Sequence, residues 1–250
     1  YCLRSQCIRF GVSVNLSDID LTGADLTGAD LTNSDLRGVN LTNTNLSRAY
    51  LRGATLTGVD LRGANLRGAN LRGANLRGAN LRGANLTEVD LSGIDLTGVN
   101  LTWANLTGAN LRGADLTEAD LTWPNLKEAD LTGAYLTGVN LSGIDLREAN
   151  LREANLREAN LRGANLTEAN LTGADLTGAD LTGAYLTNSD LRGVNLTNTN
   201  LSRAYLRGAT LTGVNLRVAD LTGARLTEAD LTRAGLTNTD VKYKNISLIF

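Results

Sequence analysis

The chain has 250 residues, with 24 basic and 26 acidic side chains and a formal net charge of −2. A charge so close to zero gives no whole-molecule argument for binding nucleic acid or an anionic membrane. Histidine is absent, which excludes nucleophiles with a histidine base, histidine metal sites and histidine acid–base catalysis. No apolar run reaches transmembrane length, and a cytoplasmic location is favoured.

Residues 1–15 precede the regular part of the sequence and are predicted to form an N-terminal cap. This segment holds the only two cysteines, Cys2 and Cys7. A disulfide or a metal pair is one interpretation, but two thiols without histidine do not complete a four-ligand site. We favour the other interpretation, in which both are small apolar residues of the cap.

From Leu16 to Leu236 every fifth residue is leucine. The residue before each leucine is usually Asn or Asp, and the residue before that is usually small or β-branched. A period of five does not fit an amphipathic helix, because at about 100° per residue successive leucines would point roughly 140° apart. The inward, outward, inward order over Ala-Asn-Leu is instead that of a strand.

The two residues after each leucine predict a corner, and the second of them is most often glycine, as expected where a turn needs positive φ. Other units have Asn, Glu or Arg at this position, so the corners are not required to share one turn type. A short strand and a corner repeated in this way predict a solenoid. One unit cannot bury its own leucine, and neighbouring coils must cover it.

Stretches such as A-D-L-T-G at 24–28 and A-N-L-R-G at 64–68 resemble the pentapeptide-repeat proteins. The resemblance covers about residues 14–240. It implies an all-β fold, a right-handed quadrilateral β-helix with twenty residues per coil, and hence about 11 coils. We therefore expect a β-solenoid over residues 16–240, followed by a C-terminal segment at 241–250.

Residues twenty apart in such a helix stack on adjacent coils, so the sequence also predicts columns of side chains on the surface. Trp103 and Trp123 share a column at the second corner position, and Pro124 interrupts the small inward position. Exposed stacked indoles are typical anchors of protein interfaces. A local pair that merely covers a corner is equally consistent with the sequence. Trp103 and Trp123 are nevertheless the best candidates for a protein-binding site.

A second column, with Tyr185, Tyr205 and Arg225, predicts an aromatic and cation–π ladder, for which we favour a structural role.

A third column consists of Glu128, Glu148 and Glu168. It either binds a cation or, with Lys127 and Arg147 beside it, forms a solvated ladder of ion pairs. The ladder is favoured.

Residues 31–59 recur unchanged at 186–214. The offset is not a whole number of coils, so Arg48 and its copy Arg203 are expected on different faces. A face-specific site would not survive this shift in both copies, and we interpret the repeated stretch as scaffold.

Residues 241–250 keep the spacing but lose the Ala-Asn-Leu order, and they end in an apolar tail that includes Leu248 and Phe250. The open end of a solenoid exposes pairing edges and apolar core. The tail therefore either caps the coil or forms a homodimer, and several members of the resembled family dimerise through this end. Leu248 and Phe250 are accordingly further candidate protein-binding residues.

The sequence predicts a non-enzymatic, rigid solenoid that acts as a protein-interaction or scaffold module. No catalytic, cofactor-binding or metal-binding residues are assigned, and neither nucleic acid nor membrane is expected as a partner. Long regular repeats of this kind resemble those abundant in cyanobacteria, where family members act in regulation through protein contacts. The alternative function is that of a DNA mimic that inhibits or protects DNA gyrase or another topoisomerase. The rod is similar, but the strong negative charge of those proteins is missing.

Overall fold

The computed structural model describes residues 16–237, so the predicted cap at 1–15 and tail at 241–250 lie outside the described residues. The chain separates into two compact units, residues 1–125 and residues 126–250. The described parts of both units have the same architecture. They contain no helix, and each strand is reduced to one bridged residue in every five, as in Asp20, Asp25 and Asp30.

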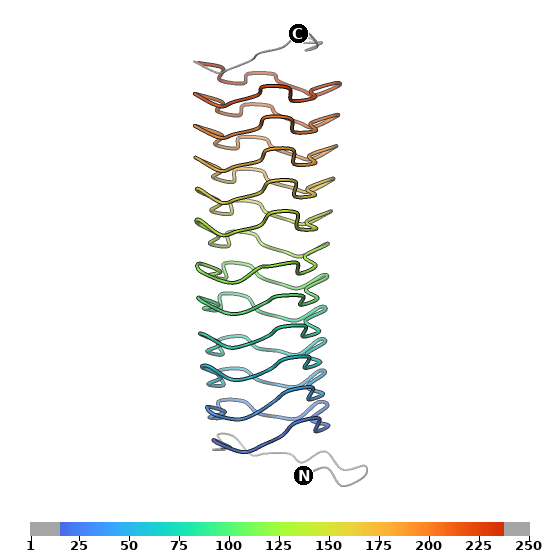
Figure 1. Ribbon diagram of the computed structural model, residues 1–250, viewed down its shortest axis with the longest axis vertical. Coiled ribbons are helices and arrows are strands. Elements are labelled where there is room, and N and C mark those ends of the chain that lie inside the picture. The colour runs from blue at the N-terminus through green and yellow to red at the C-terminus, as the bar shows by residue number, and fades with distance from the viewer. Residues whose placement is uncertain (1–15, 238–250) are drawn as a thin grey trace. The chain divides into compact units, whose positions relative to one another are not determined.

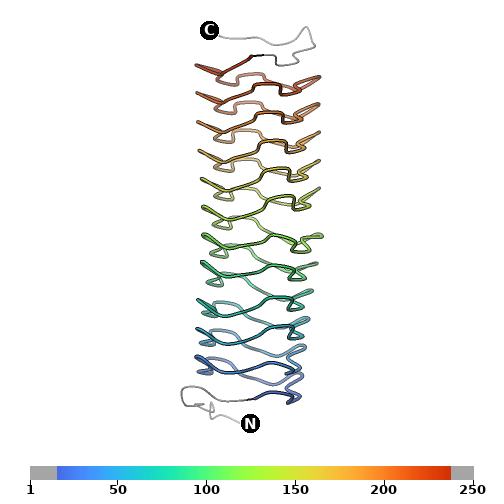
Figure 2. The same ribbon diagram turned by 90° about the vertical axis from the view of Figure 1, so that its left-hand side faces the viewer.

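Parallel bridges join residues twenty apart within each unit. In the first unit they run from Asp20↔Asn40 to Asn105↔Asn125, and in the second from Asp130↔Asn150 to Asn215↔Gly235. One coil therefore takes twenty residues and has four corners. Figures 1 and 2 show the coils of each unit stacked one on the next. The predicted solenoid with four sides is confirmed.

The interior of the coils is filled by the repeated leucines and by the small residues two positions before them. Leu46 and Leu201 have no exposed surface, and neither has Ala49 or Ala204. Where the small residue is polar it finds a carbonyl, as when Thr199 Oγ1 donates to Leu176 O at 2.8 Å. The core is thus apolar, and its polar exceptions are satisfied.

Most five-residue units satisfy their backbone amides in one way, which residues 171–175 illustrate. The leucine and second-corner amides donate to the following coil, with Leu171 N to Asp190 O at 2.8 Å and Gly173 N to Arg192 O at 3.0 Å. The outward amide of residue 175 donates to the preceding coil, and the amide of residue 174 closes the corner onto the leucine carbonyl. These four bonds leave only the amide of the first corner residue without a backbone acceptor.

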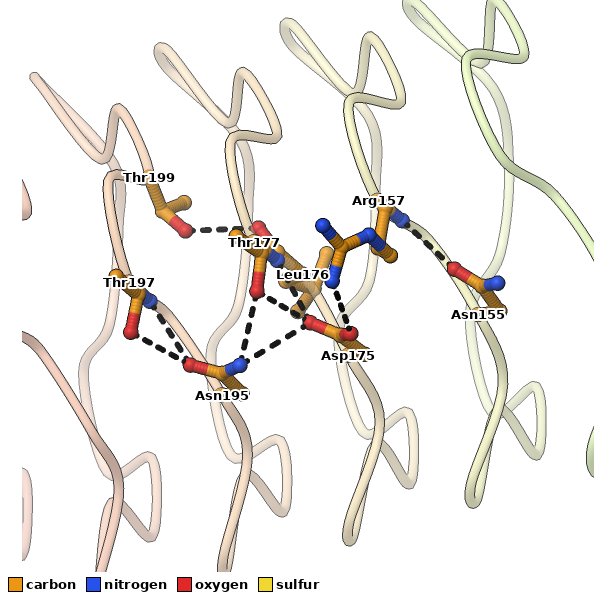
Figure 3. A network of polar contacts seen from close by, with 8 residues as sticks. All are labelled: Asn155, Arg157, Asp175, Leu176, Thr177, Asn195, Thr197 and Thr199. Atoms are coloured by element: carbon orange, nitrogen blue, oxygen red, sulfur yellow. Dashed lines mark hydrogen bonds and ion pairs between the residues drawn. The ribbon is translucent and has the colours of Figure 1, made fainter.

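A side chain supplies the missing acceptor. Where Asn or Asp precedes the leucine, its Oδ1 atom accepts from the first-corner amide two residues later, as in Thr177 N to Asp175 Oδ1 at 3.0 Å. Thr197 N donates to Asn195 Oδ1 in the same way at 3.2 Å, and Asn195 Nδ2 reaches across to Thr177 Oγ1 (Figure 3). This Asx turn is the physical reason for the Asn or Asp in the repeat.

All described corners share a positive φ at their second residue. The second corner residue has φ between +56° and +73° in every unit from Asp18 to Arg233. In most units an i to i+3 bond closes the corner, and together with a positive φ at the third residue it defines a type II turn. The corner at 121–124 differs, because Pro124 has no amide for this bond and the chain there forms an open bend. The turn types are thus not uniform, as expected, although the positive φ is. Residues such as Glu158 and Val218 adopt the left-handed conformation at a cost of about 1–2 kcal/mol, because the inter-coil bonds impose it.

The substitution Asn165→Ala tests the Asx turn. It removes the acceptor that Thr167 N uses at 3.1 Å, and we expect the free energy of unfolding to fall by about 1 kcal/mol. Thr210→Ala is the control, since Thr210 holds the same outward position, and its loss removes no Asx turn. Chemical denaturation of both variants measures the difference. Equal effects of the two substitutions would contradict the role of the Asx bond.

Candidate protein-interaction site

Trp103 and Trp123 lie on adjacent coils of the first unit, and the structure brings them together as predicted. Their ring centroids are 6.3 Å apart with an angle of 20° between the planes, and each residue is 60% exposed. The backbone sets this arrangement, because Trp103 N donates to Thr122 O at 3.1 Å. Two large apolar rings thus stand in solvent, and a backbone bond joins the coils that carry them.

A carboxylate lies on the chain just before the second indole. Asp120 Oδ1 accepts from the hydroxyl of Thr122 at 2.6 Å, and Asp120 Oδ2 accepts from the hydroxyl of Thr102 at 3.0 Å. The Thr122 hydroxyl is the main cause that lowers the pKa of Asp120, so this group stays ionised at neutral pH. Pro124 is buried and has no amide with which to close the corner that holds Trp123.

The second predicted column is an aromatic ladder, as expected. The rings of Tyr185 and Tyr205 stack with centroids 4.9 Å apart, and the guanidinium carbon of Arg225 lies 4.9 Å from the centroid of the Tyr205 ring.

The acidic column is neutralised at one end by a lysine. Lys127 Nζ lies 3.0 Å from Glu128 Oε1 and 3.4 Å from Glu148 Oε1. Arg147, expected in the same ladder, pairs instead with Asp145 at 2.6 Å. Among residues 16–237 no group of three or more acidic, cysteine or histidine side chains is placed to hold a metal ion.

The sequence also contains two exposed tyrosines that we did not single out as site residues. Tyr50 is 56% exposed and Tyr135 is 53% exposed, and both occupy the outward position that normally carries Asn or Asp. A tyrosine there gives up the Asx turn, because its hydroxyl is too far from the first-corner amide. Interruption of the Asn or Asp pattern is the sequence signal that identifies them.

Arginine neutralises much of the acidic surface. Where Asp precedes the leucine and Arg follows it, the two side chains form an ion pair around the corner. Arg192 Nε donates to Asp190 Oδ1 at 2.9 Å, and Arg192 Nη2 lies 2.5 Å from Asp190 Oδ2. Pairs of the same kind join Arg37 to Asp35, Arg62 to Asp60, and Arg147 to Asp145. Hydrogen bonds from the arginines are the first cause that lowers the pKa of each of these four carboxyl groups.

Two of the candidate residues, Leu248 and Phe250, lie outside the described residues. Their role in a homodimer stays a prediction. In the part of the chain that the structure describes, no helix is long and apolar enough to cross a membrane.

The family profile of pentapeptide repeats matches the chain in eight overlapping copies between residues 15 and 238. The chain belongs to the pentapeptide repeat family. Members of this family form right-handed quadrilateral β-helices, and the all-β solenoid of this pentapeptide repeat protein is one of them. Curated protein sequences gave no match to it.

Several solved structures are similar to this pentapeptide repeat protein. HetL, a pentapeptide repeat protein involved in heterocyst differentiation regulation from the cyanobacterium Nostoc sp. strain PCC 7120, is 39% identical over 92% of each chain, with a TM-score of 0.33. Rfr23 from the cyanobacterium Cyanothece 51142 is 31% identical over 58% of this chain and 90% of its own, with a TM-score of 0.31. QnrB1, a plasmid-mediated fluoroquinolone resistance protein, is 21% identical over 87% of this chain and 93% of its own, with a TM-score of 0.33.

The ion pairs around the corners predict a loss of stability in acid. A carboxyl group whose pKa is lower in the folded chain stabilises the fold above its unfolded pKa of about 3.9, and this contribution disappears as the pH falls through the folded-state pKa. We expect the double variant Asp145→Asn, Asp190→Asn to lose less stability than the wild type between about pH 5 and pH 2. Asparagine keeps the bond to the corner amide, as Asn170 does with Thr172 N at 3.0 Å.

Unfolding midpoints measured across this pH range provide the test. The same slope in the wild type and the double variant would contradict a stabilising role for the two ionised carboxylates.

Proposed function

We propose that this pentapeptide repeat protein is a non-enzymatic interaction module, in which a rigid solenoid presents the Trp103–Trp123 pair to a protein partner. The observation that carries the proposal is the exposure of both stacked indoles. Tryptophan is enriched among the residues that dominate binding energy, and two rings that already stack on each other lose little side-chain entropy on binding.

The backbone conformation at the two indoles strengthens this argument. Trp103 has φ +61° and Trp123 has φ +57°, a region in which a bulky side chain is unfavourable and glycine is not. Gly63 and Gly83 precede them in the same column with φ +65° and +67°. Large side chains at these two corners thus cost stability that glycine would not, which supports a role outside folding.

A regulatory role is the form of this function that we favour. HetL, which shares 39% identity with the chain, is described as involved in heterocyst differentiation regulation. The chain has no catalytic constellation among its described residues, so the proposed action is contact with another protein and not chemistry. The possible homodimer through Leu248 and Phe250 belongs to the same proposal, since it would present two copies of the indole pair.

Inhibition or protection of a topoisomerase by DNA mimicry is the alternative, and the surface charge favours it less. A DNA mimic needs an uncompensated acidic face to bind a basic groove. Here ion pairs around single corners neutralise carboxylates such as Asp35 and Asp190. Arginines of one coil also pair with aspartates of the next coil, Asp175 and Asp180, at 3.2 Å. An interface of mixed charge around an aromatic centre is more typical of ordinary protein recognition.

The double variant Trp103→Gly, Trp123→Gly tests the proposal. Its stability should stay close to that of the wild type, because the loss of a stacking contact of about 0.5–1.5 kcal/mol is offset by relief of two unfavourable backbone conformations. A partner captured from native lysate by the wild type should bind the variant at least about 30-fold more weakly, corresponding to about 2 kcal/mol. Titration of the purified partner measures this ratio.

The double variant Tyr185→Asn, Tyr205→Asn is the matched control. It removes another aromatic stack, in which Tyr185 is exposed and Tyr205 half-buried, and should leave the affinity unchanged. Undiminished binding by the tryptophan variant would overturn the assignment of the site. Inhibition of gyrase supercoiling by the wild type and by the tryptophan variant alike would instead favour the DNA mimic.

A further inference from the structure

A polar groove of about 350 Å³ lies on the first unit. The residues that line it precede Trp103 and Trp123 in the sequence. Its lining comes from adjacent coils and comprises Thr27, Ser47, Arg48, Asn65, Arg67, Gly68 and Glu88. Two guanidinium groups and several hydroxyl and amide groups therefore face one space. This collection of donors is the kind that recognises an oxyanion.

The first arginine is directed along the groove by the absence of a side chain on the next coil. Arg48 holds a second corner position with φ +56°. Its Cγ atom lies 3.9 Å from the point where a Cβ on Gly68 would stand, so the side chain extends over that glycine. Within residues 16–237 its guanidinium forms no ion pair, and its five donors are available to a ligand.

The second arginine is held at one side by a weak ion pair. Arg67 Nη2 lies 3.8 Å from Glu88 Oε1, and the two side chains are 61% and 63% exposed. A pair this long and this exposed contributes little, so an anion of higher charge can compete for Arg67. Glu88 itself lines the groove, so its carboxylate competes with a bound anion for Arg67.

The groove contains a hydroxyl that has no strong partner. Ser47 Oγ has only a long contact of 3.4 Å to Thr27 Oγ1. The Thr27 hydroxyl itself donates to Asp25 Oδ1 at 2.6 Å, and Asn45 Nδ2 lies 3.3 Å from the same carboxylate oxygen. Asp25 is thus already engaged by Thr27 and Asn45, whereas Ser47 can donate to a ligand.

The chain supplies its own comparison, because the duplicated stretch places Ser202 and Arg203 in the same setting on the second unit. Thr182 Oγ1 and Ser202 Oγ are 3.5 Å apart, and the Cγ of Arg203 lies 3.7 Å from the point where a Cβ on Gly223 would stand. The duplicated residues are therefore arranged alike in both units.

The residues that follow the duplication differ. The positions of Asn65 and Arg67 are taken by Asp220 and Thr222 in the second copy. The second copy has one arginine fewer and one carboxylate more. Its local charge is therefore two units more negative, which disfavours the binding of an anion. The copied residues by themselves are scaffold, and the second copy lacks the arginine that corresponds to Arg67.

We propose that the groove formed by Ser47, Arg48 and Arg67 binds a phosphate group, either as free phosphate or as a monoester on a larger molecule. Paired guanidinium groups bind tetrahedral dianions through charge-assisted, bidentate hydrogen bonds. The volume exceeds that of phosphate alone and leaves room for the group that carries it. This site is independent of the indole pair, so failure of one proposal leaves the other intact.

Phosphorus NMR of the full chain, titrated with inorganic phosphate and with O-phosphoserine at constant ionic strength, tests the proposal. Both ligands should show saturable binding at one site. Tighter binding of O-phosphoserine assigns the groove to an esterified phosphate, and equal binding assigns it to the free ion. Arg67→Thr should weaken binding about tenfold or more. Threonine at this corner is compatible with the fold, since Thr87 and Thr107 hold it in the next two coils.

Two further variants separate specific binding from general charge. Arg203→Gly removes the copied arginine and should leave the affinity unchanged. Glu88→Gln removes the competitor for Arg67 and should strengthen binding about twofold to tenfold, a gain that misfolding cannot produce.

The double variant Asp220→Asn, Thr222→Arg should create a second binding site on the second unit and double the stoichiometry. Absence of saturable binding to either ligand would overturn the proposal. Equal weakening by Arg67→Thr and Arg203→Gly would also overturn it, because the response would then reflect net charge only.

Discussion

The backbone amides of a five-residue unit are the constraint on which the rest of this structure depends. In most units, four of the five amides donate to carbonyl groups of the same corner or of an adjacent coil. The amide of the first corner residue donates to the side chain of Asn or Asp, as Thr172 N does to Asn170 Oδ1 at 3.0 Å. A buried or half-buried amide without an acceptor costs about 1–3 kcal/mol, repeated at every corner. The repeat therefore tolerates substitutions that leave every backbone amide with its acceptor, and substitutions that remove an acceptor destabilise it.

This constraint separates two periods that the chain uses for different purposes. The five-residue period fixes the leucine core and is the same on every side. The twenty-residue period decides which exposed side chains meet, as when Tyr185 stacks on Tyr205. Any pair of solvent-facing residues can be set side by side without altering the core. The proposed recognition surface, the Trp103–Trp123 pair, is thus added to the scaffold without a change of the core, at the expense of unfavourable backbone conformation at two corners.

Much of the fold was predictable because the leucine spacing admits few alternatives, and the stacking of Trp103 on Trp123 followed from simple arithmetic on the period. The positive φ shared by all described corners was not predictable from composition. Residues such as Glu158 and Val218 disfavour positive φ by themselves, and only the inter-coil bonds impose it. The arginine groove was also hidden, because it depends on the direction in which Arg48 leans over Gly68. That direction is a property of the corner geometry and not of the residue order.

The central claim is that the core follows the five-residue period while the surface follows the twenty-residue period. Circular dichroism of a variant that lacks residues 106–110 tests it most directly. Deletion of this single unit keeps every leucine in register but moves Trp123 to a different corner from Trp103. We expect this variant to fold cooperatively as a β-solenoid and to lose the exciton signal of the stacked indoles. A variant without residues 151–170, one whole coil, should keep that signal. An unfolded chain after deletion of the single unit, or an unchanged indole signal, would contradict the account.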